Sequence, residues 1–395
     1  MTALPQQRAA FDEFRALVMR EEQLQETLAR AEDAERFVTL ALAAATARGI
    51  PLAADTLRAA ARPDPLGLAR WSSSPADGVV WPPPSWLPVH VAAADGGAFV
   101  DWAYFGAVPL REPFFEQSIR RALARPFDRV FRYRMTMGDF VAQAARGQNP
   151  LPSGFIFHMS RCGSTLVSQM LAALPGNLVI SEAAPIDAAV QLSRIEPDLR
   201  PERHVDALTA MIAAFARYRR AAKRHCVIKL DSWHTPALPL LRRAFPSVPW
   251  IFLYRDPVEV LVSQKRMPGS QMVPGLVPAS LYGIDSFDSV EDYHARVLAS
   301  ICRAALDRHR DGGLLVNYRA LPQAAFTAIM PHFGMACDEG ERALMAAAAR
   351  RDAKTPYLEF ADDSAAKQNE ATAPLRALAE RHLGDIYRRL EGASG

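Results

Sequence analysis

The sequence contains little cysteine and no long apolar run. Its 395 residues include four cysteines, Cys162, Cys226, Cys302 and Cys337, which lie far apart and lack paired metal-ligand spacing. A disulfide framework is rare in a chain of this size, so we expect a reducing compartment and a cytoplasmic location. The longest weakly apolar run, residues 37–47, is too short to cross a bilayer, and the first residues contain no signal-peptide core. The sequence therefore predicts no membrane partner.

An excess of charge of one sign is also missing. Lys and Arg number 46 and Asp and Glu 43, the net charge is +3, and no dense basic run is present. Nucleic acid is therefore not an expected partner. Half of the residues are hydrophobic and 23% are charged, which is typical of globular proteins. Partners have to be inferred from individual sites.

Changes in residue pattern divide the chain into three predicted domains. Residues 1–62 carry apolar residues at helical spacing, interrupted by Gly49 and Pro51, and predict a small all-α domain. Residues 63–150 form an aromatic and Pro-rich connecting region, to which we assign no function. Residues 151–395 carry the patterns that suggest chemistry. No internal repeat is apparent.

Within the connecting region, three local patterns are clear enough to interpret. Residues 71–88 are rich in Pro, Ser and Trp and predict an extended loop without regular structure. Residues 97–106 predict a strand. A helix is expected to begin near Pro113, because proline suits the first turn of a helix.

From residue 151 the chain alternates short apolar runs with helical stretches. This alternation predicts an α/β fold in which a parallel sheet has helices on both faces. Ligands of such sheets bind beyond the carboxyl ends of the strands, so the loops after these strands are where we expect chemistry. The predicted strands are residues 155–158, 178–181, 226–230, 250–254 and 314–318.

The loop "MSRCGSTL" after the first strand has the composition of an anion site. Gly163 permits close approach to the backbone, Ser164 and Thr165 add hydroxyl donors, and Arg161 adds a guanidinium. A helix N-terminus also attracts anions. The loop lacks the G-x-x-x-x-G-K-[ST] spacing of triphosphate-binding loops. The structural alternative is a plain Gly-Ser helix cap.

A second loop, "YRDPVEVLVSQ", follows the fourth strand. Helix initiation explains three of its residues, because Asp256 can cap the helix, Pro257 suits its first position and Glu259 would complete a capping box. It does not explain Arg255 at the strand end or Ser263 eight residues later. We interpret these two as a second phosphate site; a surface arginine and a helical serine are the alternative.

The two loops together resemble those of the sulfotransferases that use 3'-phosphoadenylyl sulfate (PAPS). The resemblance covers about residues 151–320 and implies a P-loop nucleoside-triphosphate-hydrolase-like sheet and transfer of a sulfuryl group from PAPS. It further implies that Arg255 and Ser263 hold the 3'-phosphate. It assigns the 5'-phosphosulfate to the first loop, Arg161, Cys162, Gly163, Ser164 and Thr165, with Cys162 where serine is more common.

The resemblance also indicates catalytic residues. In the protein-tyrosine branch, the general base is a Glu that follows the loop Arg by 21 residues, and Glu182 stands 21 residues after Arg161. Lys229 matches the Lys that ends the next strand. The cytosolic branch uses a His in a Lys-Thr-His turn, where this chain has "IKLDSWH" with Asp231 as a reserve base. The alternatives are a capping or salt-bridged Glu182 and a surface Lys229.

The chemistry implied requires cations and a base. Arg161 and Lys229 would neutralise charge on the leaving side, and Glu182 would take the proton of the acceptor hydroxyl, an effect typically worth about 10²–10⁴-fold. No metal is needed. We assign structural roles to His158 and His234. Residues 359–369 lie where the family returns a polar group to the donor, which makes Ser364 and Lys367 candidates.

Other functions fit the loops less well. A Cys-x₅-Arg phosphatase fails on spacing, since Ser168 stands where the Arg is required. A P-loop small-molecule kinase would share the fold class but needs the Gly-Lys-[Ser/Thr] ending. A non-catalytic nucleotide-binding accessory protein in peptide biosynthesis is the third candidate, and would leave position 182 free to vary.

The N-terminal helices resemble the leader domain of nitrogen-fixation-type (nitrile-hydratase-like) peptide precursors. This resemblance implies a peptide acceptor or a docking partner. A plain helical accessory or dimerisation element is the alternative, and a dimerisation element would make the protein a homodimer. The matching features are Phe11, Leu24, Gln25, Leu28, Phe37, Gly49 and Ile50.

Overall fold

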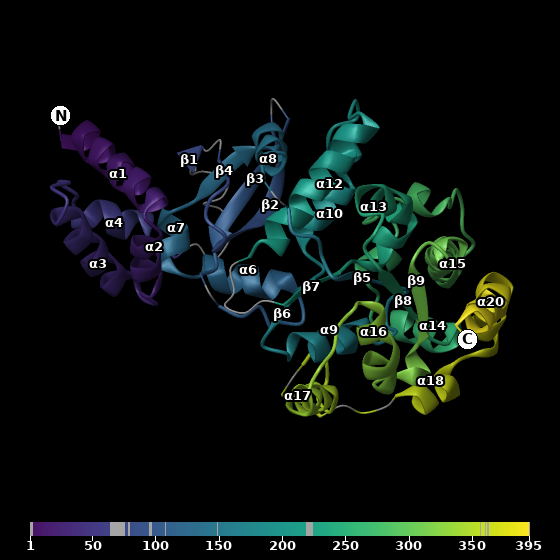
Figure 1. Cartoon of the computed structure of the whole chain (residues 1–395). Coiled ribbons are helices and arrows are strands. Elements are labelled where there is room, and N and C mark those ends of the chain that lie inside the picture. Colours follow the sequence, from purple (N-terminus) through teal and green to yellow (C-terminus); the bar gives the residue numbers. More distant parts are fainter. Residues whose placement is uncertain are drawn as a thin grey trace. The chain divides into compact units, whose positions relative to one another are not determined.

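A computed structural model shows two compact units, and each is described by itself (Figure 1). The first comprises Met1–Pro109, Phe115–Pro150 and Ala184–Ala221, and the second comprises Leu110–Phe114, Leu151–Ala183 and Ala222–Gly395. The predicted domains 1–62, 63–150 and 151–395 stay a prediction about independent folding. The residues that the structure describes are 3–63, 76–77, 80–94, 97–106, 108–147, 149–218, 224–355, 357–359, 361 and 363–394.

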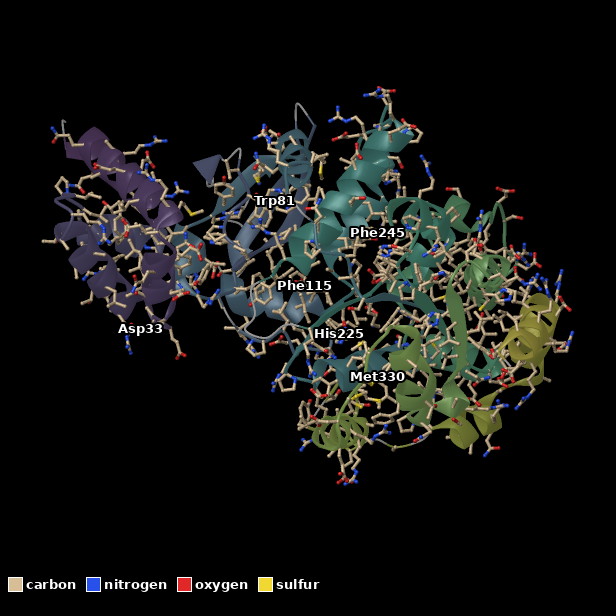
Figure 2. The ribbon with its side chains drawn as sticks, in the orientation of Figure 1. Asp33, Trp81, Phe115, His225, Phe245 and Met330 are labelled. Atoms are coloured by element: carbon tan, nitrogen blue, oxygen red, sulfur yellow. The ribbon has the colours of Figure 1, made fainter. Side chains whose placement is uncertain are left out.

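The helices predicted for the N-terminal residues are present in the first unit. They are α1 (Ala3–Arg20), α2 (Glu22–Ala29), α3 (Ala34–Thr46) and α4 (Ala54–Ala60). Asp33 begins α3, and its carboxylate accepts the backbone N–H of Arg36 at 2.8 Å (Figure 2). Helices α2, α3 and α4 each pack against α7 (Pro126–Val130), so they share the aromatic core of this unit.

Gln25 explains one of the N-terminal sequence features in structural terms. Its side chain is fully buried, accepts the indole N–H of Trp86 at 2.9 Å and donates to the Val18 carbonyl at 2.9 Å. Leu24 and Leu28 beside it are buried too. The Leu-Gln pattern of α2 therefore serves packing within the unit.

A four-stranded sheet forms the centre of the first unit, in the order β1-β4-β3-β2. The strand predicted in 97–106 is confirmed. The prediction of a loop without regular structure over residues 71–88 is wrong where β1 and the start of β2 lie. Trp86 and Leu87 are fully buried in β2, and a register shift after Pro88 accommodates that proline. Residues 71–75 and 78–79 lie outside the described residues. The strands are β1 (Ala76–Asp77), β2 (Trp86–Ala94), β3 (Gly97–Tyr104) and β4 (Tyr133–Thr136).

The remaining helices of the first unit follow the sheet. The helix expected near Pro113 is α6 (Phe115–Leu123). Helix α12 packs against α8, α10 and β2, which explains why a segment far along the chain belongs to this unit. The others are α8 (Met137–Ala144), α10 (Ala184–Val190), α11 (Leu192–Ile195) and α12 (Pro201–Ala216).

A five-stranded parallel sheet forms the centre of the second unit, in the order β6-β7-β5-β8-β9. The α/β fold class is thereby confirmed, and every predicted strand is present to within one residue. The strand order reverses about β5, and open α/β sheets bind ligands beyond the carboxyl ends of their strands at such a point. The strands are β5 (Gly154–His158), β6 (Asn177–Ser181), β7 (His225–Lys229), β8 (Trp250–Tyr254) and β9 (Gly313–Asn317).

Helices surround this sheet in the second unit (Figure 1). Asp256 caps α14 as predicted, accepting the Val258 N–H at 2.9 Å, but the Glu259 side chain pairs with Arg255 and does not complete a capping box. No described helix is long and apolar enough to span a membrane. The helices are α9 (Ser164–Ala172), α13 (Leu238–Ala244), α14 (Pro257–Arg266), α15 (Val290–Arg308), α16 (Met330–His332), α17 (Glu339–Ala349), α18 (Ser364–Glu370), α19 (Ala373–Ala379) and α20 (Asp385–Ala393).

Short turns complete the second unit. The 3₁₀ turns are η1 (Ser232–Ala237), η2 (Ser270–Met272), η3 (Ala279–Tyr282) and η4 (Tyr318–Ala320), and the π turns are η5 (Ala325–Ile329) and η6 (Glu380–Gly384). Two of them, η1 and η4, directly follow strands β7 and β9, so they reach the edge of the sheet where the predicted loops lie.

Candidate active site

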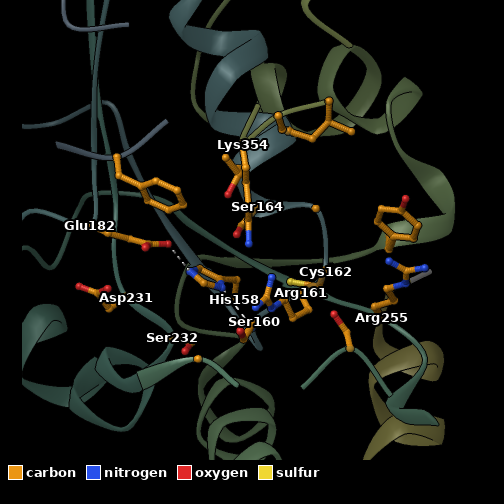
Figure 3. Close-up of a pocket in the computed structure, with 18 of the residues that line it drawn as sticks. His158, Ser160, Arg161, Cys162, Ser164, Glu182, Asp231, Ser232, Arg255 and Lys354 are labelled. Carbon is orange, nitrogen blue, oxygen red and sulfur yellow. Dashed lines mark hydrogen bonds and ion pairs between the residues drawn. The ribbon is translucent and has the colours of Figure 1, made fainter. Parts of the chain in front are cut away.

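One cavity of about 400 Å³ opens at the carboxyl ends of the parallel strands (Figure 3). Its size lies within the range of roughly 300–1,000 Å³ that ligand sites occupy. Each strand supplies lining residues at its end or just after it: His158 and residues 160–166 at β5, Glu182 after β6, Asp231–Trp233 after β7, Arg255 after β8 and Tyr318 after β9. The loops predicted to carry chemistry therefore meet in one place.

The loop between β5 and α9 requires glycine at position 163. Gly163 has a φ of +84°, and a Cβ added there would lie 2.7 Å from Cδ1 of Leu321 and 2.9 Å from Cδ2 of Tyr318. Helix α9 begins at the next residue, so the N–H groups of Ser164 and Thr165 belong to its unpaired first turn. An anion at this point would meet backbone donors and the positive end of the helix.

Arg161 is fixed at the edge of this loop. Its guanidinium donates to the Met267 carbonyl at 2.6 Å, and the preceding Ser160 accepts a hydrogen bond from the Gln264 amide at 3.0 Å. Both contacts lead to the end of α14. Burial lowers the pKa of Arg161, which Glu182 partly offsets; the side chain lines the cavity as predicted.

The side chain of Cys162 has a structural role. The thiol is fully buried and donates to the Leu253 carbonyl of β8 at 3.0 Å. Burial raises its pKa to about 12, so it stays a thiol at neutral pH. What this residue offers the cavity is its backbone, and the thiol ties the loop to the sheet.

Glu182 and Lys229 form an ion pair at the ends of two neighbouring strands. The register pairs Ser181 with Lys229, and the Glu182 N–H donates to the Lys229 carbonyl at 2.8 Å. The Lys229 ammonium, which is fully buried, donates to Oε1 of Glu182. Burial by itself opposes ionisation of Glu182, but the cation and the His158 hydrogen bond outweigh it and lower the pKa of the carboxyl.

The backbone of Glu182 is strained. Its φ is +52°, and among the described non-glycine residues only Ser160, with +78°, and Arg161, with +52°, share a positive φ. Left-handed backbone costs a non-glycine residue about 1–3 kcal/mol and persists where the surroundings impose it, often at functional sites. All three residues lie at the same cavity.

His158, predicted to be structural, lies between the anion loop and Glu182. It ends β5, is buried, and its Nδ1 accepts the Ser160 N–H at 3.1 Å. Its Nε2 is 3.0 Å from the Leu230 carbonyl and 3.4 Å from Oε1 of Glu182. The sequence feature that could have indicated a functional role for His158 is its position, as the last residue of a buried strand directly before an anion loop.

Asp231, the reserve base, caps the turn η1. Its carboxylate accepts the His234 N–H, and its own N–H donates to Nδ1 of His234 at 3.3 Å, so the two residues form a capping box. Asp231 lines the cavity, but its carboxylate has this structural partner. The structural role predicted for His234 fits the same contacts.

Arg255 is buried among several partners at the other end of the cavity. It donates to Glu259 at 2.6 Å, to Asp363 at 3.0 Å and to the Ser364 hydroxyl at 2.9 Å. Its guanidinium lies 4.1 Å from the ring centroid of Tyr318. The planar cation is thus held on one face by an aromatic ring and at its edge by carboxylates.

The C-terminal segment lies next to Arg255, as predicted for the candidate residues Ser364 and Lys367. Lys367 is buried, and its ammonium lies 2.7 Å from the Asp363 carboxylate that also pairs with Arg255. Ser263 lines the same cavity. Arg255 and Lys367 around one partly exposed carboxylate, with Ser263 in the same cavity, make a fitting place for a phosphate.

Comparison with known proteins identifies the family of the central part of the chain. Residues 152–339 match the model described as "Sulfotransferase family". This part of the chain belongs to the sulfotransferase family. The protein is therefore a sulfotransferase-class enzyme, and the family implies PAPS as the sulfuryl donor. A search of curated protein sequences gives no significant match.

Solved structures similar to this sulfotransferase are distant in sequence. The sulfotransferase domain from the olefin synthase of Synechococcus PCC 7002 is 20% identical, with 62% of this chain and 95% of that chain covered and a TM-score of 0.37. Sulfotransferase STF9 from Mycobacterium avium is 12% identical, with 62% and 79% covered and a TM-score of 0.40.

Lys354 is a site residue of the sulfotransferase that the sequence interpretation missed. It follows α17 in the chain and points into the cavity toward the anion loop (Figure 3). Its ammonium has no hydrogen-bond or ion-pair partner among the described residues. The residue as a whole is exposed, but its ammonium is desolvated inside the cavity, and this desolvation, with Arg161 and Lys229 nearby, lowers the pKa of the lysine to about 8. No local motif marks it.

All predicted site residues of the sulfotransferase come together. Lys229 reaches the cavity through its ion pair with Glu182. The other eight line it directly, namely Arg161, Cys162, Gly163, Ser164, Thr165, Glu182, Arg255 and Ser263. Their individual roles stay predictions.

Proposed function

We propose that this sulfotransferase transfers the sulfuryl group of PAPS to an acceptor hydroxyl with Glu182 as the general base. The observation that carries the proposal concerns the two carboxylate oxygens of Glu182. Lys229 and His158 both contact Oε1, whereas Oε2 has no partner among the described residues. Oε2 is therefore the oxygen that takes the acceptor proton.

Two cations and a helix end stabilise the transferring group in this proposal. The 5'-phosphosulfate lies over Gly163 at the N-terminus of α9, between Arg161 and Lys229. As the bond from sulfur to the bridging phosphate oxygen breaks, negative charge grows on that oxygen, and fixed cations stabilise it. The acceptor oxygen bonds to sulfur from the opposite side, and its proton passes to Glu182. The step requires no metal ion.

The ion pair makes the base dependent on the donor. In the free enzyme Lys229 lowers the pKa of Glu182, which makes the carboxylate a weak base. A sulfuryl group beside Lys229 is a second anion for the same ammonium. When Lys229 is shared with the sulfuryl group, it stabilises the Glu182 carboxylate less, and the pKa of the carboxyl rises. Glu182 therefore becomes an effective base only when PAPS is bound.

The 3'-phosphate belongs at the other end of the cavity. Arg255, Ser263, Ser364 and Lys367 supply cations and hydroxyl donors there. Asp363 occupies the position between the two cations in the free enzyme. We infer that the phosphate replaces this carboxylate, which is partly exposed and free to turn outward.

We further infer that the acceptor hydroxyl belongs to a peptide. The position of Glu182 relative to Arg161 is that of the protein-tyrosine branch, and the α1–α4 helices resemble a leader-peptide domain. A small-molecule hydroxyl is the alternative acceptor. The cytoplasmic location and a homodimer formed through the N-terminal helices remain predictions of the same kind.

Calorimetric titration separates a sulfotransferase from a kinase. We expect 3',5'-adenosine bisphosphate (PAP) to bind without a metal and ATP with Mg²⁺ to bind far more weakly. Binding of ATP but not of PAP would contradict the donor assignment. Arg255→Ala should abolish PAP binding, whereas Glu370→Gln, on the exposed Arg266 pair, should leave it unchanged.

Turnover of PAPS tests the base. Tyrosine peptides, 4-nitrophenol and water serve as acceptors, and release of PAP is measured. Glu182→Gln should bind PAP normally and lose about 10²–10⁴-fold in kcat. Full turnover by this variant would exclude Glu182 as the base and make Asp231 the next candidate.

A further inference from the structure

His158 links the donor loop to Glu182 through its two ring nitrogens. Nδ1 accepts the N–H of Ser160, whose φ is +78°, and Nε2 faces the Leu230 carbonyl and Oε1 of Glu182. A nitrogen that accepts a backbone N–H carries no proton, so the ring proton lies on Nε2. The Leu230 carbonyl, at 3.0 Å, accepts this proton, and Oε1 of Glu182 lies beside the same N–H at 3.4 Å, so a neutral His158 can also turn the N–H toward the catalytic carboxylate.

The surroundings keep the ring neutral and in one orientation. His158 is 5% exposed at the end of a central strand. Burial, with Lys229 nearby, lowers its pKa despite the opposing effect of Glu182. A ring without charge at neutral pH cannot replace Lys229 as a counter-ion of Glu182, but it can fix the direction of the carboxylate.

His158 and Lys229 approach the same carboxylate oxygen of Glu182. Lys229 donates to Oε1, the His158 Nε2–H that bonds the Leu230 carbonyl lies near the same oxygen, and Figure 3 shows the His158 ring directed at the Glu182 carboxylate. In the proposed reaction Lys229 also serves the sulfuryl group. The 3.4 Å separation from Nε2 is long, which is common for catalytic hydrogen bonds in a free enzyme before the substrate complex tightens them.

We propose that His158 is a positioning residue, which holds Oε1 of Glu182 so that Oε2 faces the acceptor after Lys229 has turned to the sulfuryl group. Through Nδ1 the same ring sets the Ser160 backbone of the donor loop, so one side chain aligns the base with the donor. This inference rests on the proposed function of Glu182.

Two amide variants separate the two contacts. In His158→Asn the amide oxygen takes the place of Nδ1 and can accept the Ser160 N–H, but no donor reaches Glu182. In His158→Gln the amide nitrogen takes the place of Nε2 and can donate to Glu182, but the Ser160 N–H loses its acceptor. A purely structural histidine would show no such division, and both variants would impair binding and turnover together.

The expected results differ in kcat and in affinity. His158→Asn should keep the Kd of PAP within about twofold and lower kcat for PAPS, with 4-nitrophenol or water as acceptor, by about 10- to 100-fold. His158→Gln should weaken PAP binding about three- to tenfold and retain more of kcat. Equal losses in both variants, or the reverse pattern, would overturn the proposal.

The pH profile gives a readout that packing alone would not move. The charged groups around Glu182 are Lys229 on β7, Arg161 in the donor loop and Lys354 after α17, and Asp231 lines the same cavity. Loss of the His158 donor removes an interaction that favours the carboxylate. The acid limb of kcat/KM should therefore move to higher pH, by about one pH unit, in His158→Asn.

A measurement on the unaltered enzyme keeps the inference testable if the variants fold poorly. Nitrogen-15 NMR of the imidazoles should show His158 as the neutral Nε2–H form at pH 7, and Glu182→Gln should perturb its Nε2 resonance. An Nδ1–H or doubly protonated ring at pH 7 would overturn the proposal.

Failure of this inference is distinguishable from failure of the proposed base. If Glu182→Gln keeps full turnover, Glu182 is not the base and His158 has nothing to position. If Glu182→Gln loses turnover while His158→Asn does not, the base stands and only the role of His158 is wrong.

Discussion

The fully buried ammonium of Lys229 is paired with the partly exposed carboxylate of Glu182 across the ends of two adjacent parallel strands. Breaking such a pair from the carboxylate side leaves a buried charge without a partner, which costs about 3–5 kcal/mol. Removing the lysine leaves a carboxylate that still contacts solvent and His158. The two partners should therefore contribute unequally to stability.

A double-mutant cycle in urea tests this asymmetry. Glu182→Gln should lower the free energy of unfolding by about 3–5 kcal/mol and Lys229→Met by less, about 1–3 kcal/mol. The double variant should lose clearly less than the sum of the two. Additive losses would mean that the two side chains do not interact in the folded protein.

The left-handed backbone at Glu182 predicts an unusual order of stability. Glu182→Gly should be more stable than Glu182→Ala by about 1 kcal/mol, because both variants lose the ion pair but only glycine tolerates a φ of +52° without strain. Leu344, exposed in the interior of α17, provides the control. There the glycine variant should be the less stable by about 1 kcal/mol. The same order at both positions would contradict strain at Glu182.

The lowered pKa of Lys354 predicts that donor binding depends on pH. In the free enzyme this ammonium loses its proton as the pH rises through about 8, so the affinity for PAP should fall between pH 7 and pH 9. Lys354→Arg stays charged and should remove this dependence, and Lys354→Met should bind more weakly at pH 7 and likewise show no fall. The Cys162 thiol does not interfere, since its pKa is raised to about 12. Calorimetry at several pH values measures the effect.

The position of Asp363 predicts that removing its charge will increase the affinity for PAP. Its carboxylate pairs with Arg255 and Lys367 where a 3'-phosphate would bind, and 47% of its side chain is exposed. Asp363→Asn removes the competing charge and should tighten PAP binding about two- to fivefold, a modest effect because the pair is partly solvated. Glu370→Gln, at the far end of the helix α18 that Asp363 precedes, serves as the control. Weaker binding in Asp363→Asn would indicate that the carboxylate positions the two cations and does not compete with the ligand.

Local patterns predicted much of the second unit. Each parallel strand is a short, buried apolar run between breakers, so its period and length are visible in the sequence, as with Trp250–Tyr254. The anion loop and its glycine were also predictable. In the first unit, β2 was missed because Trp86 to Pro88 looks like loop composition, and only pairing with β3 and burial make it a strand.

The sequence by itself determined the α/β class, the two strand-end loops and the identity of the residues at positions 161, 182, 229 and 255, because residue type and spacing are local properties. Only the tertiary structure decided how these residues are connected. It placed Lys354 over the loop, brought Asp363 and Lys367 to Arg255, and set His158 against Oε1 of Glu182. Those contacts join strand ends and loops far apart in the chain, and no local pattern encodes the register and crossovers that bring them together.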